Sequence, residues 1–395
     1  MKTLSALVLG FVLMASPALA APATGEPIKI GEMMPYTNGP SFAVPFREGW
    51  QIALEQINKE GGVHGRPVEI VSRDDQADPA VAVRIAEELV SREKVVMLIG
   101  AGFDNVGLAV GNYVNRYHVP LLKQWAGSCG PIEDPQNTYW FNTTPCYGPY
   151  ARIFAREAAK LPYKKWAMIG PNYEFGHAMN ESFKAELQRL RPDVVFVSER
   201  YPAVSKINAA AEIRAIDRTK PDAIFSTIFS GDLASYLLHA QKVGFLQDKY
   251  CISGTNIGSK TSIKELGTAY PAGWLTEGVP QDTNGLPVDP FVKLYESKYE
   301  QRPDLMAIYG YQILLVAVDS LRKAKSLNGE DIRNALENAK IDGPFGPVQM
   351  KNKQLYPGFW LGHTDNQNGK GSMVNLKWHS PEDLFPEAFQ TTIAQ

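Results

Sequence analysis

The stretch VVMLIGAGFDNVGLAV, residues 95–110, joins an apolar strand to a helix through a glycine-containing turn. Its GAG triplet, residues 100–102, imitates the opening of the dinucleotide fingerprint G-x-G-x-x-G, but Asn105 occupies the position of the third glycine. The unit is not the first strand of its series, and Lys123 ends the next strand where the fingerprint needs an acidic residue. We therefore predict one strand–turn–helix unit of a longer series, with no NAD and no other cofactor.

The alternation of strand and helix continues on both sides of this unit. Upstream, the strand IKIGEMM precedes an amphipathic helix that ends at Gly61-Gly62, and the strand RPVEIVSRDD precedes a helix with Asp78 as N-cap and Pro79 at its first position. Downstream, the strands VPLLKQWA and TYWFNTT lead to a helix that opens near Pro149. A second series runs from KWAMIGP to KYCISGT, and short antiparallel strands follow it. Two such series predict an α/β fold of two doubly wound parallel-sheet lobes.

Composition and charge are those of an ordinary globular protein. The chain has 395 residues, 44% hydrophobic and 21% charged, which is a length typical of two domains. Forty basic residues against 42 acidic ones give a formal net charge of -2. This balance lacks the basic excess of nucleic-acid-binding proteins, so we expect no nucleic-acid partner.

The N-terminal sequence MKTLSALVLGFVLMASPALA is typical of a secretory signal peptide. Lys2 supplies the positive start, the apolar core is too short to span a bilayer, and Ala18-Leu19-Ala20 is a small-x-small cleavage signal. We predict that residues 1–20 are removed after Ala20. The residue directly after the predicted cut is Ala21 and not a cysteine, so we expect no lipid anchor, and we predict no later membrane-spanning segment.

Three cysteines remain after the predicted cut. Cys129 and Cys146 lie in the turn-like stretches GSCGP and TTPCYGP, whereas Cys251 lies in the apolar strand KYCISG. In an oxidising compartment one pair can form a disulfide. We favour a bridge between Cys129 and Cys146, with Cys251 as a buried thiol.

Several of these segments together resemble a known family. The strand IKIGEMMPYTNGP is followed by a helix that ends in INKEGGVHGR, then by a strand, the motif DDQADP, another helix and the strand VVMLIG. This order resembles the type I periplasmic binding proteins of branched-chain amino acid ABC importers. The later segments IGPNYEFGHA and HAQKVGF also resemble the family, and the likeness covers nearly all of the chain after the predicted signal peptide.

The resemblance implies a two-lobe binding protein that closes on a small ligand. Three crossovers would join a first lobe, residues 27–146 plus 278–343, to a second lobe, residues 147–277 plus 344–395. The ligand would sit in the cleft between the lobes. The resemblance further implies a periplasmic monomer whose partners are a small-molecule carboxylate ligand and the ABC permease subunits of the inner membrane.

Ligands of open α/β sheets bind beyond the carboxyl ends of the strands, where helices begin. Because of this rule and the resemblance, we place the candidate ligand-binding residues at strand-to-helix turns. In the first lobe they are Phe42, Phe103, Asp104, Trp125, Gly127 and Ser128. Past the first crossover and in the second lobe they are Tyr147, Tyr150, Tyr173, Phe175, Phe229, Ser230, Asp232, Thr255 and Asn256.

Several of these residues also have a purely structural interpretation. Phe103 and Trp125 fit core positions, although they follow strands rather than lie within them. Phe175 can pack against the start of its own helix. Asp104 and Asp232 fit the acidic first turn that the helix dipole favours.

Two charged features point to local structure rather than to a ligand or metal site. Lys123 is more typical of a partner for a neighbouring carboxylate than of a ligand contact. Asp74, Asp75 and Asp78 lack the spacing and the distal glutamate of a calcium loop, and a helix cap accounts for Asp78. We therefore expect no metal site.

The ligand stays open between two classes. Relatives that bind amino acids place an acidic residue at a second-lobe turn, whereas this chain has SGTNIG there, with Thr255 and Asn256. The aromatic residues at the other turns favour an aromatic or other hydrophobic carboxylate. An amino acid remains the alternative, with Asp104 or Asp232 as the group that would bind its ammonium.

Two other functions are less well supported. A secreted α/β hydrolase would need the elbow G-x-S-x-G, which AGSCG around Ser128 only imitates. Of the six histidines, His64, His118, His177 and His239 show no pairing with a candidate nucleophile. We therefore expect no enzyme. A sensory ligand-binding protein is the second alternative, and it would have to signal by docking on a separate receptor.

Overall fold

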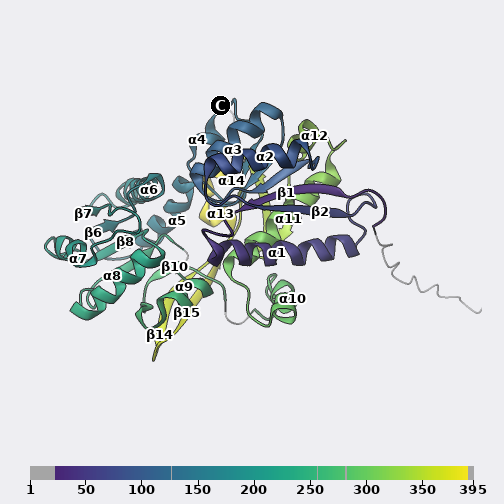
Figure 1. Ribbon diagram of the computed structural model, residues 1–395. Helices are drawn as coiled ribbons and strands as arrows, with labels where there is room; N and C mark the ends of the chain where they lie inside the picture. Colours follow the sequence, from purple (N-terminus) through teal and green to yellow (C-terminus); the bar gives the residue numbers. More distant parts are fainter. Residues whose placement is uncertain (1–22, 126, 256, 281–282, 390–395) are drawn as a thin grey trace, which may run out of the picture.

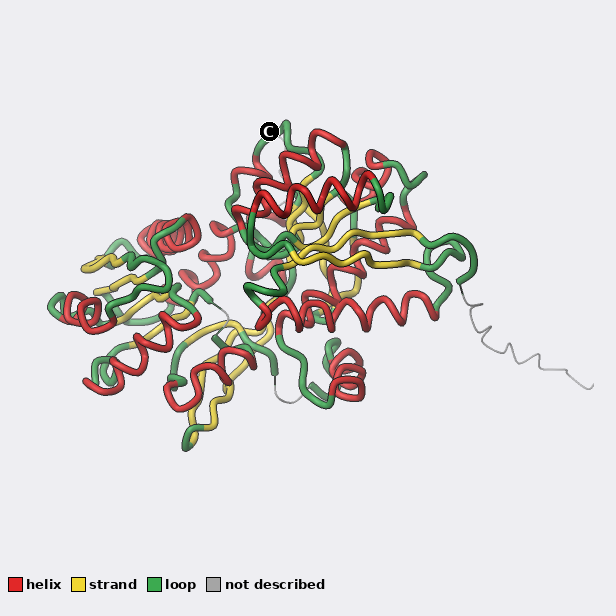
Figure 2. The backbone as a smooth tube through the Cα atoms, in the orientation of Figure 1, coloured by secondary structure: helices red, strands yellow, loops and turns green. Residues whose placement is uncertain are grey.

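The computed structural model describes residues 23–125, 127–255, 257–280 and 283–389. The predicted signal peptide and its cleavage site lie outside these residues. Two sheets, each with helices on both faces, form two lobes that lie side by side (Figures 1 and 2). The predicted two-lobe α/β fold is confirmed.

The first sheet has eight strands. In spatial order they are β11 (Lys340–Gly343), β12 (Gly346–Lys351), β13 (Gln354–Tyr356), β5 (Trp140–Asn142), β4 (Leu121–Lys123), β3 (Met97–Gly100), β1 (Ile28–Met34) and β2 (Val68–Asp74). The helices of this lobe are α1 (Pro40–Lys59), α2 (Pro79–Ser91), α3 (Asp104–Tyr117), α4 (Gly130–Glu133), α10 (Asp289–Tyr299), α11 (Leu305–Lys323) and α12 (Gly329–Leu336).

The second sheet has seven strands. In spatial order they are β15 (Lys370–His379), β14 (Phe359–Gln367), β10 (Leu275–Glu277), β9 (Tyr250–Ser253), β8 (Ala223–Ser226), β6 (Lys165–Ile169) and β7 (Val195–Arg200). Its helices are α5 (Tyr147–Ala159), α6 (Glu174–Leu190), α7 (Ala209–Asp217), α8 (Ser230–Val243), α9 (Lys260–Leu266), η1 (Gly267–Ala269), α13 (Pro381–Leu384) and α14 (Pro386–Phe389).

The same strand order recurs in both lobes. The parallel strands run β2-β1-β3-β4-β5 in the first sheet and β7-β6-β8-β9-β10 in the second. In each sheet the order reverses direction between its first and third parallel strands, and helices leave toward opposite faces at that point. Such a switch point leaves a crevice at the carboxyl ends of the strands, where ligands of open α/β sheets bind.

Local sequence explains several element boundaries. The Asp78 carboxylate accepts hydrogen bonds from the N–H groups of Ala80 (2.8 Å) and Val81 (2.9 Å), which confirms it as the N-cap of α2. Helix α5 begins at Tyr147, two residues before the predicted Pro149. Helix α11 is long and apolar enough to cross a membrane by length and composition, which we did not expect. However, 78% of its apolar window is buried, as in a core helix.

One predicted boundary is wrong. The strands β12 and β13 pair with the first sheet, β13 directly with β5 through Gln354 and Asn142. Residues 346–356 therefore belong with the first sheet and not with the predicted second-lobe segment 344–395. The reason is that the chain continues as a hairpin from β11 before it crosses to β14, so the third crossover follows Tyr356. With the crossings after β5 and β10, the predicted total of three crossovers is confirmed.

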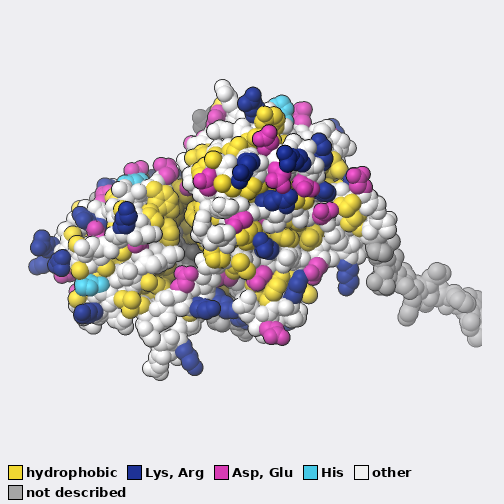
Figure 3. Space-filling model, viewed as in Figure 1, with side chains coloured by type: hydrophobic (Ala, Val, Ile, Leu, Met, Phe, Trp, Pro, Cys, Tyr) yellow, Lys and Arg dark blue, Asp and Glu magenta, His cyan; other side chains and the backbone are white. Residues whose placement is uncertain are grey.

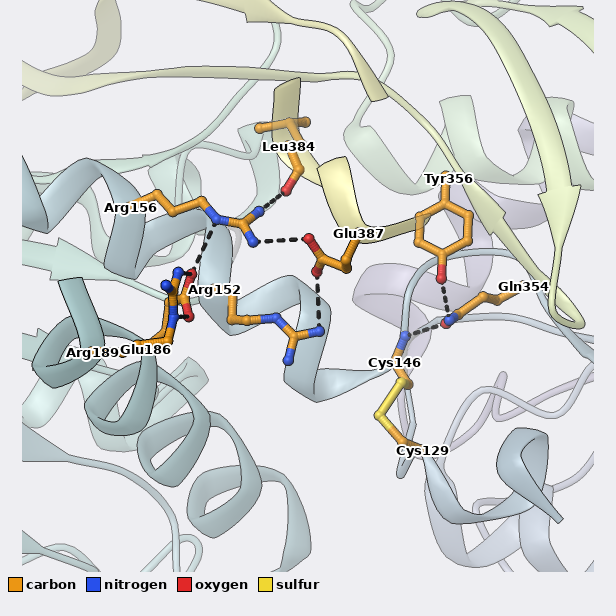
Figure 4. A network of polar contacts seen from close by, with 10 residues as sticks. All are labelled: Cys129, Cys146, Arg152, Arg156, Glu186, Arg189, Gln354, Tyr356, Leu384 and Glu387. Atoms are coloured by element: carbon orange, nitrogen blue, oxygen red, sulfur yellow. Dashed lines mark hydrogen bonds and ion pairs between the residues drawn. A yellow bond between two sulfur atoms is a disulfide. The ribbon is translucent and has the colours of Figure 1, made fainter. Parts of the chain in front are cut away.

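Polar contacts and a disulfide fix the chain near the crossovers (Figure 4). Cys129 and Cys146 form the disulfide that we favoured, with Cα atoms 5.2 Å apart, and Cys251 is buried and unbridged. The Cys146 N–H donates to Gln354 at 2.8 Å, and so ties the start of α5 to β13.

The C-terminal segment is held against the second lobe by arginines of α5 (Figure 4). Arg156 donates to the carbonyl oxygen of Leu384 and pairs with Glu387 at 2.9 Å, and Arg152 pairs with the same carboxylate at 3.1 Å. Arg156 also pairs with Glu186 of α6 at 3.2 Å. One guanidinium therefore links α5, α6 and the end of the described chain.

Candidate functional site

Residues that follow strands of both sheets line one shared cleft. It is open to solvent and has a volume of about 260 Å³, which is near the lower end for small-molecule pockets. Figure 3 shows a hollow between the two halves of the molecule, with hydrophobic side chains along its edge. The switch points of the two sheets therefore supply the two walls of a single site.

Most of the predicted residues come together at this cleft. They are Phe42, Phe103, Asp104, Trp125, Tyr147, Tyr150, Tyr173, Phe175, Phe229, Ser230 and Thr255. Asn256 lies outside the described residues. The remaining three, Gly127, Ser128 and Asp232, lie elsewhere.

Each of these three has a local structural explanation. A side chain at Gly127 would come within 2.9 Å of the Asp104 carboxylate, so Gly127 lies behind the cleft wall and not on it. Ser128 lines a neighbouring apolar groove. Asp232 accepts hydrogen bonds from the N–H groups of Ser205 (2.7 Å) and Ile207 (3.3 Å), so it orders the loop after β7.

Aromatic rings form both walls of the cleft. In the first lobe the ring centroid of Phe42 lies 5.5 Å from that of Phe103, edge-on, and 4.8 Å from that of Trp125, and we call these three residues the first-lobe aromatic group. In the second lobe the ring centroid of Phe175 lies 5.1 Å from that of Tyr147 and 6.2 Å from that of Phe229, and we call these three the second-lobe aromatic group. A flat or apolar ligand placed between the two groups would bury both of its faces.

The backbone is strained where the chain enters the cleft. Ala101, Trp125 and Ser230 have φ values of 50°, 69° and 48°, in the left-handed region that residues with a Cβ rarely adopt. Each follows a central parallel strand. Such conformations cluster at ligand sites, where the surrounding structure imposes them.

Three helices begin at the cleft without a side-chain cap. The N-cap positions of α3, α6 and α8 are Phe103, Tyr173 and Phe229, and none of these side chains bonds to the helix start. The first N–H groups of a helix have no intrahelical acceptor, and the helix dipole favours negative charge there. These ends can therefore bind an acceptor such as a ligand carboxylate.

Asp104 is already paired with a cation. Its Oδ1 lies 3.4 Å from Nζ of Lys123, whose side chain is fully buried, and its Oδ2 accepts from the Tyr147 hydroxyl. Burial lowers the pKa of Lys123, and the nearby Asp104 carboxylate opposes this shift. The interpretation of Lys123 as a carboxylate partner is confirmed. Asp104 therefore already has a counter-ion in the protein, and Asp232 is not among the residues that line the cleft.

A buried glutamate that we did not predict faces the cleft. Glu277 ends β10 at the second crossover, and only 2% of its surface is exposed. Its two carboxylate oxygens accept hydrogen bonds from the hydroxyls of Tyr150 and Tyr309, each at 2.7 Å. Burial raises the pKa of Glu277 to about 7, although both hydrogen bonds oppose the shift.

The two lobes also touch directly along the cleft. The Thr261 N–H of α9 donates to the Asp304 carboxylate at 2.9 Å, and its hydroxyl donates to the Ser41 carbonyl oxygen at 3.4 Å. Lys260 donates to Gln301 at 3.2 Å. These cleft contacts were also missed, because they join segments far apart in the sequence that carry no common motif.

Comparisons with known proteins agree with this architecture. A family model described as periplasmic binding protein matches residues 27–370. The Leu/Ile/Val-binding protein homolog 7 of Brucella melitensis is 23% identical over 393 residues, covering 93% of this chain and 94% of that protein.

Two solved structures resemble the whole fold. A solute binding protein of an ABC transporter from Rhodopseudomonas palustris BisB5, in complex with 3,4-dihydroxybenzoic acid, has a TM-score of 0.78 at 21% identity, covering 90% of this chain and 97% of that one. The branched-chain amino acid transporter substrate binding protein LivJ from Streptococcus pneumoniae, in complex with isoleucine, has a TM-score of 0.78 at 19% identity, covering 90% and 100%. The family match, the two doubly wound lobes and the cleft between them lead to one conclusion: this chain belongs to the periplasmic binding protein family, with the type I fold of the branched-chain amino acid transporter group.

Proposed function

We propose that the protein is the solute-binding component of an ABC importer and captures a small acid with an aromatic or other hydrophobic body. Its family serves ABC transporters, and the solute, its mode of binding and the partner subunits are the proposed part. The observation that carries the proposal is the cleft lined by aromatic groups of both lobes.

The chemistry of the cleft supports a ligand with one apolar and one anionic part. The first-lobe and second-lobe aromatic groups would enclose the apolar body. The uncapped starts of α3 and α8 would receive the carboxylate. Because the ligand would contact both lobes only when they approach, it would favour the closed state by its extra contacts there.

The ligands of the two relatives in solved structures fit this description. One is a hydroxylated benzoic acid and the other is isoleucine, and both join a carboxylate to an apolar body. A branched-chain or other amino acid is the second candidate, since Glu277 places a carboxylate on the cleft wall. In the proposed role the signal peptide is removed after Ala20, and a periplasmic monomer delivers the ligand to permease subunits.

Equilibrium binding tests the proposal. The secreted protein would be screened by thermal shift against benzoates, cinnamates and branched-chain amino acids, and each hit would be titrated by calorimetry. We expect a saturable single site whose ligand raises the melting temperature and reduces the radius of gyration in solution scattering.

A variant pair locates the site. Phe229→Ala should weaken the ligand by tenfold or more, an estimate based on the roughly 1.5–3 kcal/mol of a buried aromatic contact. Tyr117→Ala is the matched control, because Tyr117 is 54% exposed at the far end of α3. Equal loss in both variants, or no binding by any acid in the screen, would argue against the proposed function.

A further inference from the structure

We propose that Glu277 is a specificity-determining residue, whose carboxylate binds a positively charged nitrogen on the ligand. This inference rests on the proposed function and narrows its ligand class. The selected ligand would carry a protonated amine or amidine as well as its acid group and apolar body.

The first support is the position of Glu277. It ends β10 where the chain leaves the second lobe, while Tyr150 lies just past the first crossover and Tyr309 lies in α11 of the first lobe. All three side chains line the cleft. The two tyrosine hydroxyls hold the carboxylate from both lobes, so its orientation toward the cleft is fixed by the hinge.

The second support is the missing countercharge. Among the described residues that line the cleft there is no lysine or arginine. The partners of Glu277 in the described part of the chain are the two tyrosines, whereas Asp104 has the buried ammonium of Lys123. Asp304, which is also buried in the cleft, is the N-cap of α11 and accepts from the N–H groups of Met306 (3.1 Å) and of Thr261 at the start of α9 (2.9 Å), so two helix starts compensate its charge. Glu277 has neither a cation nor a helix start beside it, only the two neutral hydroxyls.

The third support is unused bonding capacity. An ionised carboxylate has about four acceptor positions, and the two tyrosines occupy one on each oxygen. An ionised carboxylate that is buried without a counter-ion is unfavourable, and burial therefore raises the pKa of Glu277. A ligand cation would remove this penalty and fill the free positions, so the cleft should discriminate in favour of it.

Matched ligand pairs test the inference. L-phenylalanine and 3-phenylpropanoate share a ring and a carboxylate but differ in the amine, and L-leucine and 4-methylpentanoate differ in the same way. We expect the amine-bearing member of at least one pair to bind the full-length secreted protein about tenfold or more tighter, as hydrogen bonds to charged groups commonly give. Glu277→Gln should remove this preference, measured as the ratio of the two affinities within each pair.

A matched control separates recognition from folding. Glu32 is also fully buried, also accepts hydrogen bonds from a tyrosine and a serine, and also has a pKa raised by burial to about 7, but it is not among the cleft residues. Glu32→Gln should keep the amine preference. If Glu277→Gln does not fold, Tyr309→Phe serves instead, because it removes one positioning hydroxyl and should reduce the preference severalfold.

The outcomes are distinguishable. Binding of both acids in each pair with equal affinity, or an unchanged preference in Glu277→Gln, would overturn the role of Glu277 while the proposed function stands. Failure of all four compounds and of the wider acid screen would overturn the proposed function and the inference with it.

Discussion

Replacing Asp104 by Asn should leave an uncompensated ammonium inside the first lobe. Lys123 is fully buried, and after the substitution its Nζ would keep neutral acceptors alone, namely the carbonyl oxygens of Gly102 (3.1 Å) and Gln124 (3.2 Å) and the amide oxygen of the new side chain. Removing one partner of a buried ion pair costs about 3–5 kcal/mol. Because the Asp104 side chain is 15% exposed, we expect the lower end, about 3 kcal/mol off the free energy of unfolding.

Removing both charges should cost less than removing one. In Asp104→Asn/Lys123→Met the buried charge is gone, and an apolar side chain of similar length fills its place, so we expect a loss of about 1 kcal/mol. The assay is a double-mutant cycle by urea unfolding at pH 7, followed by tryptophan fluorescence, with m values compared across the four proteins. If Asp104→Asn costs less than about 1 kcal/mol and the second substitution simply adds to it, the pair does not stabilise the cleft wall as we argue.

Three further predictions concern stability. Gly107→Ala should cost about 1–3 kcal/mol in urea unfolding, because its new methyl group would lie 2.5 Å from Cε of Lys123; a neutral substitution would show that the ammonium stem can move. Burial raises the pKa of Glu32 from 4.5 to about 7, so its contribution to the free energy of unfolding is complete below about pH 4.5 and is lost as the pH rises through about 7. Glu32→Gln should flatten the fall of the free energy of unfolding across this pH range, and an unchanged fall would refute the assignment. Replacing Cys129 and Cys146 by Ser should lower the free energy of unfolding by about 3 kcal/mol for a bridge that spans 17 positions, and an unchanged urea midpoint would count against it.

Local sequence patterns predict the fold because most parallel strands are followed directly by an amphipathic helix. The turn after β3, with Phe103 and Asp104, and the turn after β8, with Phe229, follow directly from strand ends and reach the cleft. Asp232 follows the same rule but turns to the loop after β7, since a first-turn acid binds whichever N–H groups lie near it. Sequence position alone cannot show which neighbour that is.

Glu277 and Tyr309 escape such patterns because the chain crosses to the other lobe after β10, and Tyr309 does not follow a strand at all. Glu277 ends β10 immediately before a crossover, and Tyr309 lies inside a core helix, 32 positions further on. Tertiary packing alone brings them together. The available signal was the acidic residue at the end of the apolar strand in GWLTEGVP. Burying a carboxylate costs free energy, so an acid at the end of a buried strand indicates a specific role.

The strands that cover one edge of each sheet lie close together near the end of the chain. Strand β13 covers the edge of β5 in one lobe, and β14 covers the edge of β10 in the other. A chain that ends at residue 339 would thus expose two unpaired strand borders, each a template for adhesion to another chain. Because one continuous stretch covers both edges, a product truncated late in synthesis would be prone to aggregate through both lobes.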